Sequence, residues 1–249
     1  MQKMNLVLKV LICLTFLSLT ACGSGGADGS GAVNESVDLP ASELLDEDAV
    51  SEANGGGALL DTGEVQHLVF MREEEKLARD VYLTLGAKYP NLKVFGNIAK
   101  SEERHTCAVC DKLEQYGIED PVDADNIGVF SGVEYGAYFS EKFQLLVDRG
   151  EMSELEALYV GAYIEELDMI DIVQCPKAII DADNGLDSPD DCGLEYTEND
   201  EIVNTLTSLL EGSKDHLRAF VKLIESRIGE GNYQAQILDS VQVDEILGR

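Results

Sequence analysis

Tryptophan is absent from this chain of 249 residues, proline occurs five times, and aromatic residues make up only 6% of the sequence. Proline interrupts helices because its ring removes a backbone hydrogen bond, so its scarcity favours long helices. The chain also has no run of alternating polar and hydrophobic residues long enough to be typical of a half-buried strand. The sequence therefore predicts an all-α protein.

Basic residues are scarce as well. There are 18 lysines and arginines against 48 aspartates and glutamates, which gives a formal net charge of −30. A surface of this charge repels nucleic acids and anionic lipid headgroups, and it attracts cations. We therefore expect no nucleic acid among the partners of the chain. Most of the acidic residues are expected to form an ordinary solvated surface that keeps the protein soluble.

The beginning of the chain has no acidic side chain. Two lysines are followed by a hydrophobic run over 10–19, which is too short for a comfortable membrane span and is typical of a secretory signal. The run ends in the letters LTAC at 19–22, which resemble the bacterial lipobox. We predict a lipoprotein signal peptide over 1–22 and acylation of Cys22. This lipid would anchor the protein to a membrane of the cell envelope, on the periplasmic side or the outer surface; cleavage after Ala21 without acylation is the alternative.

The rest of the chain divides into a tether and one domain. Residues 23–57 are rich in Gly, Ser and acidic residues, which is typical of a flexible tether. The domain over 58–249 is long enough for one full core. Hydrophobic residues spaced by three and four predict a short helix at 134–149, a short helix in the tail after 229, and long helices over 60–88, 93–116, 153–174 and 198–228. An insert rich in Asp and Gly occupies 175–197. Four long helices with polar inner faces predict a four-helix bundle.

The chain has only three histidines, and one of them forms a Glu-x-x-His pair. Glu102 and His105 are three residues apart, so both side chains can point from one helix face into the core. Helical bundles use such pairs to bind transition metals, and imidazole with carboxylate suits iron, manganese or zinc. Taken alone, the pair is a weak signal because such pairs are common on helix surfaces. We interpret His67 as structural or exposed.

Each of the other three long helices carries polar residues on its predicted inner face. A carboxylate on a hydrophobic stripe is costly to bury unpaired, and a metal ion would compensate its charge. Glu74 and Glu166 are the alternative ligands if the helices are rotated by one residue. Together the four helices offer six candidate ligands for a two-metal site: Glu75, Glu102, His105, Glu165, Asp168 and His216.

Three segments resemble a known family. They are MREEEKLARDVY at 71–82, IEELD at 164–168 and GSKDHLRAF at 212–220. Together they resemble a bacterial and archaeal family of domains of unknown function that is assigned to the ferritin-like superfamily, near rubrerythrin. The first segment is also similar to the first helix of ferritin, where a metal-binding Glu precedes an Ala by three residues and a Tyr by seven, as Glu75 precedes Tyr82 here. The resemblance covers about 60–240 and implies a ferritin-like bundle with two metal ions, iron before manganese or zinc.

The predicted fourth long helix departs from this pattern. Proteins of the bacterioferritin and rubrerythrin type carry a second Glu-x-x-His there, whereas Ser213 precedes His216 in this chain. Asp168 is the candidate for the missing carboxylate. The resemblance carries no established reaction. The candidate ligands leave two hypotheses: a di-iron oxidase, peroxidase or ferroxidase acting on oxygen, peroxide or ferrous iron, or a metal-binding or sequestering protein without turnover. A structural module that binds no metal is the third interpretation.

Partners other than the membrane are not identified by the sequence. The electron donor of an enzyme would be unknown, with Tyr82 a candidate redox or hydrogen-bonding residue near the metals. A ferritin-type cage is not expected for a tethered protein, while a homodimer stays open. Within the insert, the letters DADNGLD at 181–187 are similar to Asp-rich calcium loops, but they are one residue short of the EF-hand spacing and lack its terminal Glu. A solvated loop is the favoured interpretation, and calcium is the alternative.

Four cysteines remain after the signal peptide and the acylated cysteine: Cys107, Cys110, Cys175 and Cys192. In an exported protein they suggest disulfides, and three pairings exist. The simplest joins Cys175 to Cys192 and closes the insert. Cys107 and Cys110 would then form a redox-active pair near the metals or a plain structural bond. A zinc ion bound by all four is the less favoured alternative in an oxidising compartment.

Overall fold

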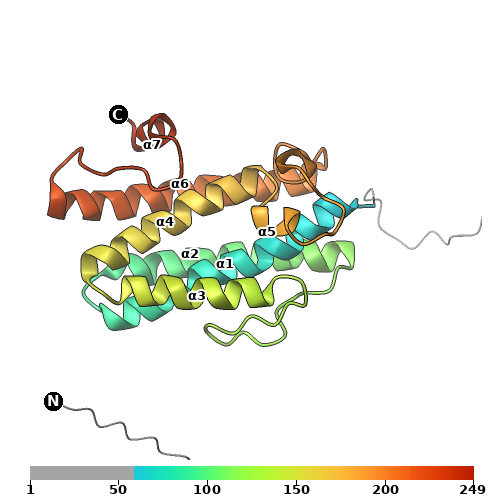
Figure 1. The fold of residues 1–249 in the computed structure, drawn as a ribbon, viewed down its shortest axis with the longest axis horizontal. Coiled ribbons are helices and arrows are strands. Elements are labelled where there is room, and N and C mark those ends of the chain that lie inside the picture. The colour runs from blue at the N-terminus through green and yellow to red at the C-terminus, as the bar shows by residue number, and fades with distance from the viewer. Residues whose placement is uncertain (1–58) are drawn as a thin grey trace, which may run out of the picture. The chain divides into compact units, whose positions relative to one another are not determined.

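The computed structural model describes residues 59–249. The predicted signal peptide, Cys22 and the predicted tether lie outside the described residues. Within the described part, the secondary structure consists of seven α-helices and one short 3-10 helix, without strands (Figure 1). This confirms the all-α prediction. None of the described helices is long and hydrophobic enough to cross a membrane.

The helices begin and end close to the predicted residues. The four long ones are α1 (Thr62–Lys88), α2 (Lys93–Tyr116), α4 (Glu154–Val173) and α6 (Asp200–Ile228). The shorter ones are α3 (Gly136–Gly150), α5 (Lys177–Ile180), η1 (Pro189–Asp191) and α7 (Ser240–Leu247).

Capping residues explain why the long helices start and stop where they do. Asp61 accepts a hydrogen bond from the backbone N of Glu64 at 3.0 Å, and the Glu64 side chain accepts from the backbone N of Asp61 at 3.2 Å. Ser153 caps α4 in the same way by accepting from the backbone N of Glu156. Gly117 ends α2 with a φ of 68°, a left-handed conformation that glycine adopts without strain.

The helix α1 lies at the centre of the described part. It packs against α2 along its length and also contacts α3, α4 and α5 (Figure 1). The other main pairing joins α4 to α6, and α6 in turn contacts α2. The rings of Tyr82, Phe95 and Phe220 meet between these helices, with centroids 5.3 to 6.1 Å apart. Gly161 leaves room for Phe220, because a Cβ at this position would lie 2.4 Å from that ring.

A fully buried ion pair of α1 holds the loop that connects α2 to α3. Lys76 pairs with Asp80 one turn later, and neither side chain is exposed. Lys76 Nζ also donates to the backbone O of Asn126 at 2.8 Å, and Asp80 accepts from the backbone N of Gly128 at 2.9 Å. Arg79 donates to Asp80 and to acidic residues of α2 and the loop. We call Lys76, Arg79 and Asp80 the loop-anchoring network.

The insert after α4 is closed by a disulfide. The structure joins Cys175 to Cys192, with the two Cα atoms 4.5 Å apart. Within the stretch that resembles a calcium loop, Asp181 forms an ion pair with Lys177. Asn184 accepts from the backbone N of Leu186 in the same stretch. These polar groups thus make local contacts, and calcium binding by the stretch stays a prediction.

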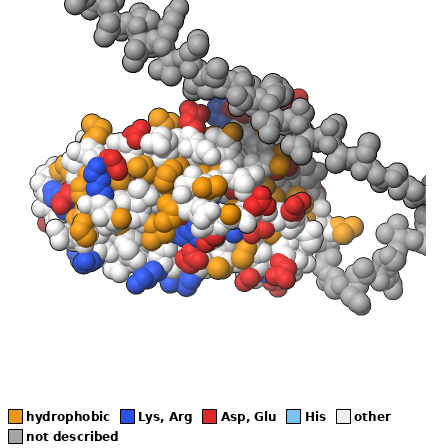
Figure 2. Space-filling view, turned by 90° about the horizontal axis from the view of Figure 1, so that it is seen from below, with side chains coloured by type: hydrophobic (Ala, Val, Ile, Leu, Met, Phe, Trp, Pro, Cys, Tyr) orange, Lys and Arg blue, Asp and Glu red, His pale blue; other side chains and the backbone are white. Residues whose placement is uncertain are grey.

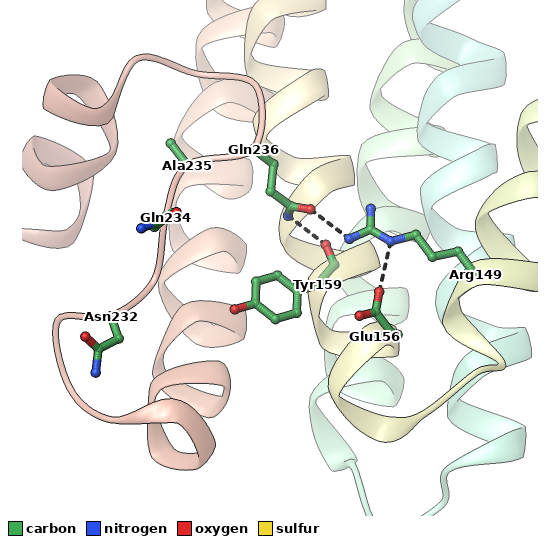
Figure 3. A pocket seen from close by; sticks show the side chains of 7 residues that line it. All are labelled: Arg149, Glu156, Tyr159, Asn232, Gln234, Ala235 and Gln236. Carbon is green, nitrogen blue, oxygen red and sulfur yellow. Dashed lines mark hydrogen bonds and ion pairs between the residues drawn. The ribbon is translucent and has the colours of Figure 1, made fainter.

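The chain after α6 folds back onto α4. Glu166 is fully buried and accepts a hydrogen bond from Tyr233 Oη at 2.6 Å. It also accepts from three successive backbone N–H groups, at 236, 237 and 238, at distances of 2.6 to 3.0 Å. Figure 3 shows that Gln236 accepts from Arg149 and donates to the backbone O of Tyr159. The open cavity beside these residues measures about 400 Å³ and contains none of the predicted metal ligands.

The described surface mixes charges with hydrophobic groups. Figure 2 shows acidic, basic and hydrophobic side chains interspersed on one face, with acidic ones gathered towards one end. The most exposed large hydrophobic side chains, Leu59, Val133 and Met152, belong to three separate segments. Scattered hydrophobic residues of this kind are normal on a protein surface, so they mark no docking face by themselves.

Candidate metal centre

The helix α2 carries the pair around which the candidate site is built. Glu102 and His105 lie one turn apart, and His105 Nδ1 is 2.9 Å from Glu102 Oε2. Glu75 reaches the same nitrogen from α1, with its Oε2 3.4 Å away. Ligand atoms of these three residues lie within 4.8 Å of one another, as ligands of a single metal ion would. Glu75 and Glu102 are buried, whereas the His105 side chain keeps 12% of its surface exposed.

A second group of the same composition adjoins the first. His216 of α6 places its Nδ1 2.8 Å from Glu102 Oε1 and 3.4 Å from Glu165 Oε2. Glu102 therefore belongs to both groups and faces one histidine with each of its two oxygens. The two imidazole rings stack with their centroids 5.5 Å apart. The arrangement is two positions, each with two carboxylates and one imidazole, joined by a shared carboxylate.

Several buried atoms of these residues lack hydrogen-bond partners. They are Glu75 Oε1, Glu102 Oε1, His105 Nδ1 and His216 Nδ1. The histidine nitrogens and carboxylate oxygens lie close together, yet these four atoms make no hydrogen bond to one another. Buried polar groups without partners are rare, and an unplaced ion is one of their explanations. The donor set of carboxylate oxygens and imidazole nitrogens fits iron, manganese or zinc.

The charges of the five residues are strongly interdependent. Burial alone would lower the pKa of His105, but Glu102 and Glu75 outweigh it and raise this pKa to about 11. Burial likewise opposes the acidic neighbours of His216, which raise its pKa to about 10. Burial would raise the pKa of Glu102, yet the two histidines bring it down to about 2. Without a metal, two protonated imidazoles thus compensate the buried carboxylates.

The net pKa shift of the outer carboxylates, Glu75 and Glu165, is opposite to that of Glu102, because burial outweighs the histidines there. Burial raises the pKa of Glu75 to about 7 and that of Glu165 to about 7, although the histidines act against it. At neutral pH these two groups are therefore only partly ionised in the metal-free protein. A divalent cation would favour their ionised forms.

Neighbouring residues position the ligands. Tyr82 Oη donates to Glu165 Oε1 at 2.5 Å, from deep within the core. Gly212 makes room for the imidazole of His105, because a Cβ at this position would lie 2.5 Å from its Cε1 atom. Ser213 of α6 donates to Asp168 Oδ2 and thereby holds a buried carboxylate of α4.

The structure brings together five of the six predicted ligands. Asp168 is buried nearby but lies outside both groups, with its Oδ1 atom unpaired. The alternative ligands have other partners: Glu166 binds the chain after α6, and Glu74 contacts Asp171 of α4. His67 is buried and lies 2.7 Å from the backbone O of Asp171, which makes it a structural residue.

Two contributors were missed by sequence reasoning. Gly212 was part of a motif, but nothing in the sequence showed that an imidazole from another helix would lie against it. Asp171 follows Asp168 by three residues, the same step that separates Asp168 from Glu165, so extending that stripe of α4 by one turn would have found it.

The remaining two cysteines have free thiols in the structure. Cys107 is exposed, and Cys110 is partly buried with its Sγ 3.0 Å from the backbone O of Cys107. Burial raises the pKa of the Cys110 thiol, which makes it a weaker nucleophile at neutral pH. Neither sulfur belongs to the two ligand groups. A redox role for this pair stays a prediction.

Comparisons with known proteins agree with one another. A family model described as an uncharacterized protein domain, DUF2202, matches residues 64–249. The uncharacterized protein MJ0754 of Methanocaldococcus jannaschii is 40% identical over 184 residues, covering 74% of this chain and 86% of its own length. The crystal structure of the hypothetical protein MJ0754 resembles this fold with a TM-score of 0.64 and 38% identity, covering 79% of this chain and 98% of that one. The chain therefore belongs to the DUF2202 family.

Proposed function

We propose that this protein is an exported ferritin-like protein whose long helices form a bundle around two metal ions, with iron the first candidate and manganese or zinc the alternatives. The single observation that carries the proposal is the shared carboxylate: each oxygen of Glu102 faces a different histidine, and both histidine nitrogens are buried without a hydrogen-bond partner. A purely structural cluster would be expected to satisfy these atoms within the protein.

The two positions would be held by matching residues. Glu75 and His105 would hold one ion, Glu165 and His216 the other, and Glu102 would contact both. Although Ser213 replaces the usual Glu, the position at His216 would have as many candidate ligands as the position at His105. Each group contains two carboxylates and one imidazole. Two iron ions in these positions would supply redox chemistry towards oxygen, peroxide or ferrous iron. Tyr82 would fix the orientation of Glu165, and the burial of the carboxylates would exclude water.

A binding protein without turnover is the second candidate. It is favoured by the net charge of −30, which concentrates cations around the protein. The two candidates share the same ligands. They differ in whether the loaded protein consumes oxygen or peroxide.

Export and lipid anchoring form part of the proposal. The disulfide between Cys175 and Cys192 supports it, because such bonds persist in oxidising compartments. Replacement of Cys22 by Ser is expected to move the protein from the membrane fraction to the soluble fraction of cells that export it. Unchanged membrane attachment of this variant would contradict acylation at Cys22.

Metal analysis of the purified protein tests the centre itself. The protein is expected to hold about two transition-metal ions per chain after dialysis, as the two ligand groups require. The double variant His105→Ala/His216→Ala should lose both ions while its helical circular dichroism is kept. His67→Gln is the matched control, because it changes the third histidine without touching a ligand group. A double variant that keeps its metal would contradict the proposal.

The same proteins decide between the two candidate functions. The iron-loaded wild type of an oxidase or peroxidase should consume oxygen or peroxide, and the double variant should not. Equal consumption by both would exclude catalysis at this centre. Tight binding of metal without consumption would establish the sequestering function.

A further inference from the structure

The two free cysteines lie on the helix that carries half of the candidate ligands. Cys107 and Cys110 are one turn apart on α2, and Cys110 Sγ lies 3.0 Å from the backbone O of Cys107. Cys107 is exposed, and Cys110 is partly buried. An accessible thiol beside a second thiol is the arrangement of cysteine pairs that are oxidised and reduced reversibly, because the second thiol can close a disulfide with the first.

The other cysteine pair of the chain provides a comparison. Cys175 and Cys192 are joined in a disulfide, and both are buried. A compartment that maintains such a bond also contains disulfides that can oxidise accessible thiols. Exchange with a thiol or disulfide from solution needs access to a sulfur atom, which Cys107 offers and the buried pair does not. The pair on α2 is therefore the one that can change its redox state.

Helix geometry opposes a disulfide at this spacing without forbidding it. Side chains three residues apart on an α-helix have Cβ atoms about 5–6 Å apart, whereas a disulfide joins Cβ atoms about 3.5–4.5 Å apart. The turn from 107 to 110 must therefore contract by about 1–2 Å when the bond forms. Disulfides that are strained or exposed are easily reduced, so this bond would open again in the presence of thiols.

The cysteine turn shares backbone hydrogen bonds with the turn that carries the ligands. In an α-helix each N–H group donates to the carbonyl four residues earlier. The carbonyl of His105 therefore accepts from the N–H group of Val109, which lies between the two cysteines. The carbonyl of Glu102 accepts in the same way from Thr106, the residue before Cys107. A contraction of the cysteine turn thus acts on the backbone of both ligands.

We propose that Cys107 and Cys110 form a reversible disulfide that distorts α2 and thereby weakens metal binding by Glu102 and His105. The exposed Cys107 attacks a small disulfide and releases one thiol; Cys110 then attacks the sulfur of Cys107 and releases the second thiol. Two electrons pass from the cysteines to the small disulfide, and their two protons end on the released thiols. The effect on metal binding rests on the proposed function, whereas the disulfide and the distortion of α2 do not.

Mass spectrometry tests the formation of the bond. After treatment of the purified protein with oxidised glutathione, the tryptic peptide 105–112, which contains both cysteines, should be lighter by two hydrogens and carry no glutathione. Reduced glutathione should then restore both thiols while Cys175 and Cys192 stay joined. A peptide that keeps two free thiols, or one that retains glutathione on Cys107, would overturn the proposal.

Hydrogen exchange of the metal-free protein tests the distortion. The backbone amides at 106–110 are expected to exchange about tenfold faster in the oxidised protein, because their helical hydrogen bonds open more often. The double variant Cys107→Ser/Cys110→Ser is the matched control, and the same oxidising treatment should leave its exchange unchanged. Equal exchange in the oxidised and reduced wild type would show that α2 accommodates the bond without distortion, which would overturn the link to the ligands.

The affinity for Mn²⁺ tests the effect on the centre. The oxidised wild type is expected to bind Mn²⁺ about tenfold more weakly than the reduced wild type, a coupling of ordinary size, while the double variant binds equally after both treatments. By reciprocity, the Mn²⁺-loaded protein should need about tenfold more oxidising conditions to form the disulfide. Equal affinities of the two wild-type forms would refute the switch. Absence of Mn²⁺ binding in both forms would instead contradict the proposed function, with the disulfide and the distortion still decided by the first two experiments.

Discussion

Two regions of the same helix bury charge in different ways. The loop-anchoring network of α1 pairs its charges within the protein, and none of the side-chain atoms of Lys76, Arg79 or Asp80 is left buried without a partner. The candidate metal centre buries a comparable set of charges, yet both histidine nitrogens and oxygens of two glutamates remain unpaired. The comparison teaches that burial of charge alone does not mark a site. A binding site is indicated instead by buried charged groups whose atoms have no partner within the protein.

The largest expected effect lies in the network. Lys76→Ala should lower the free energy of unfolding by about 3–5 kcal/mol, because it removes one of the two cations that pair with the buried carboxylate of Asp80. Urea denaturation of the metal-free protein measures this change. Lys177→Ala removes a lysine with the same spacing to an aspartate on the surface, and it should cost less than about 0.5 kcal/mol. Equal costs for the two variants would show that the buried pair does not stabilise the fold.

Metal binding at the candidate centre should respond to pH. Because the pKa values of His105 and His216 are raised to about 11 and about 10, binding of metal must displace a proton from each near neutral pH. The free energy of Mn²⁺ binding should become more favourable by about 2.7 kcal/mol per pH unit between pH 7.5 and 8.5, at about 1.4 kcal/mol for each proton. Calorimetry in buffers of different ionisation enthalpy counts these protons. Binding that releases none would contradict the protonated state of the metal-free centre.

The same shifts act on the stability of the metal-free fold. Since the two histidine pKa values are raised above 6.5, their contribution to stability is fully present below pH 6.5 and is lost as pH rises through 10 and 11. The lowered pKa of Glu102 works in the other direction, because its contribution is present above pH 4.5 and is lost as pH falls towards 2.

A smaller change should affect the centre through its packing. Gly212→Ala places a methyl group against His105 and should cost about 1–3 kcal/mol of stability, the usual cost of overpacking. Metal affinity should fall as well because the imidazole must move. Gly96→Ala is the control, since a Cβ at that exposed position of α2 meets no atom within 4 Å. If both variants kept full metal affinity, the position of His105 would not matter to binding.

The smallest expected effect concerns a tyrosine hydroxyl that contacts a candidate ligand. Tyr82→Phe removes the hydrogen bond to Glu165 and should lower the free energy of unfolding by about 1 kcal/mol, the typical net contribution of such a bond. Thermal unfolding with and without Mn²⁺ separates the effect of the substitution on the stability of the fold from its effect on metal binding by Glu165. A loss confined to the metal-free protein would indicate that the metal alone orients Glu165.

The sequence predicted the helices well because residues close to each helix end determine where the helix starts or stops. Ser153 and Gly117 act on backbone groups within a few residues of themselves, so no distant contact is needed to place these ends. The ligand-bearing faces followed from the spacing of three and four for the same reason. The spacing of hydrophobic residues did not determine the rotation of each helix about its own axis to within one residue. Glu74 and Glu75 were both open until the structure placed Glu75 beside His105 and Glu74 beside Asp171.

Local sequence patterns could not predict contacts between segments that are far apart in the chain. The buried pair of Lys76 and Asp80 was not predicted, because nothing nearby in the sequence shows that the loop after α2 will cover it. Glu166 was weighed as a metal ligand, although its partners lie about seventy residues later in the chain. These charges could be assigned only once the long-range packing was known.

Glu166 has one further consequence, for the exchange of backbone hydrogens. The segment 236–238 contains no helix, and such segments normally exchange their amide hydrogens quickly because the groups face water. Here three consecutive amides donate to one buried carboxylate, so each can exchange only when the segment leaves α4. Deuterium uptake at these amides therefore measures how often the end of the chain detaches from the helix that carries Glu165, and it does so without any label at the centre itself.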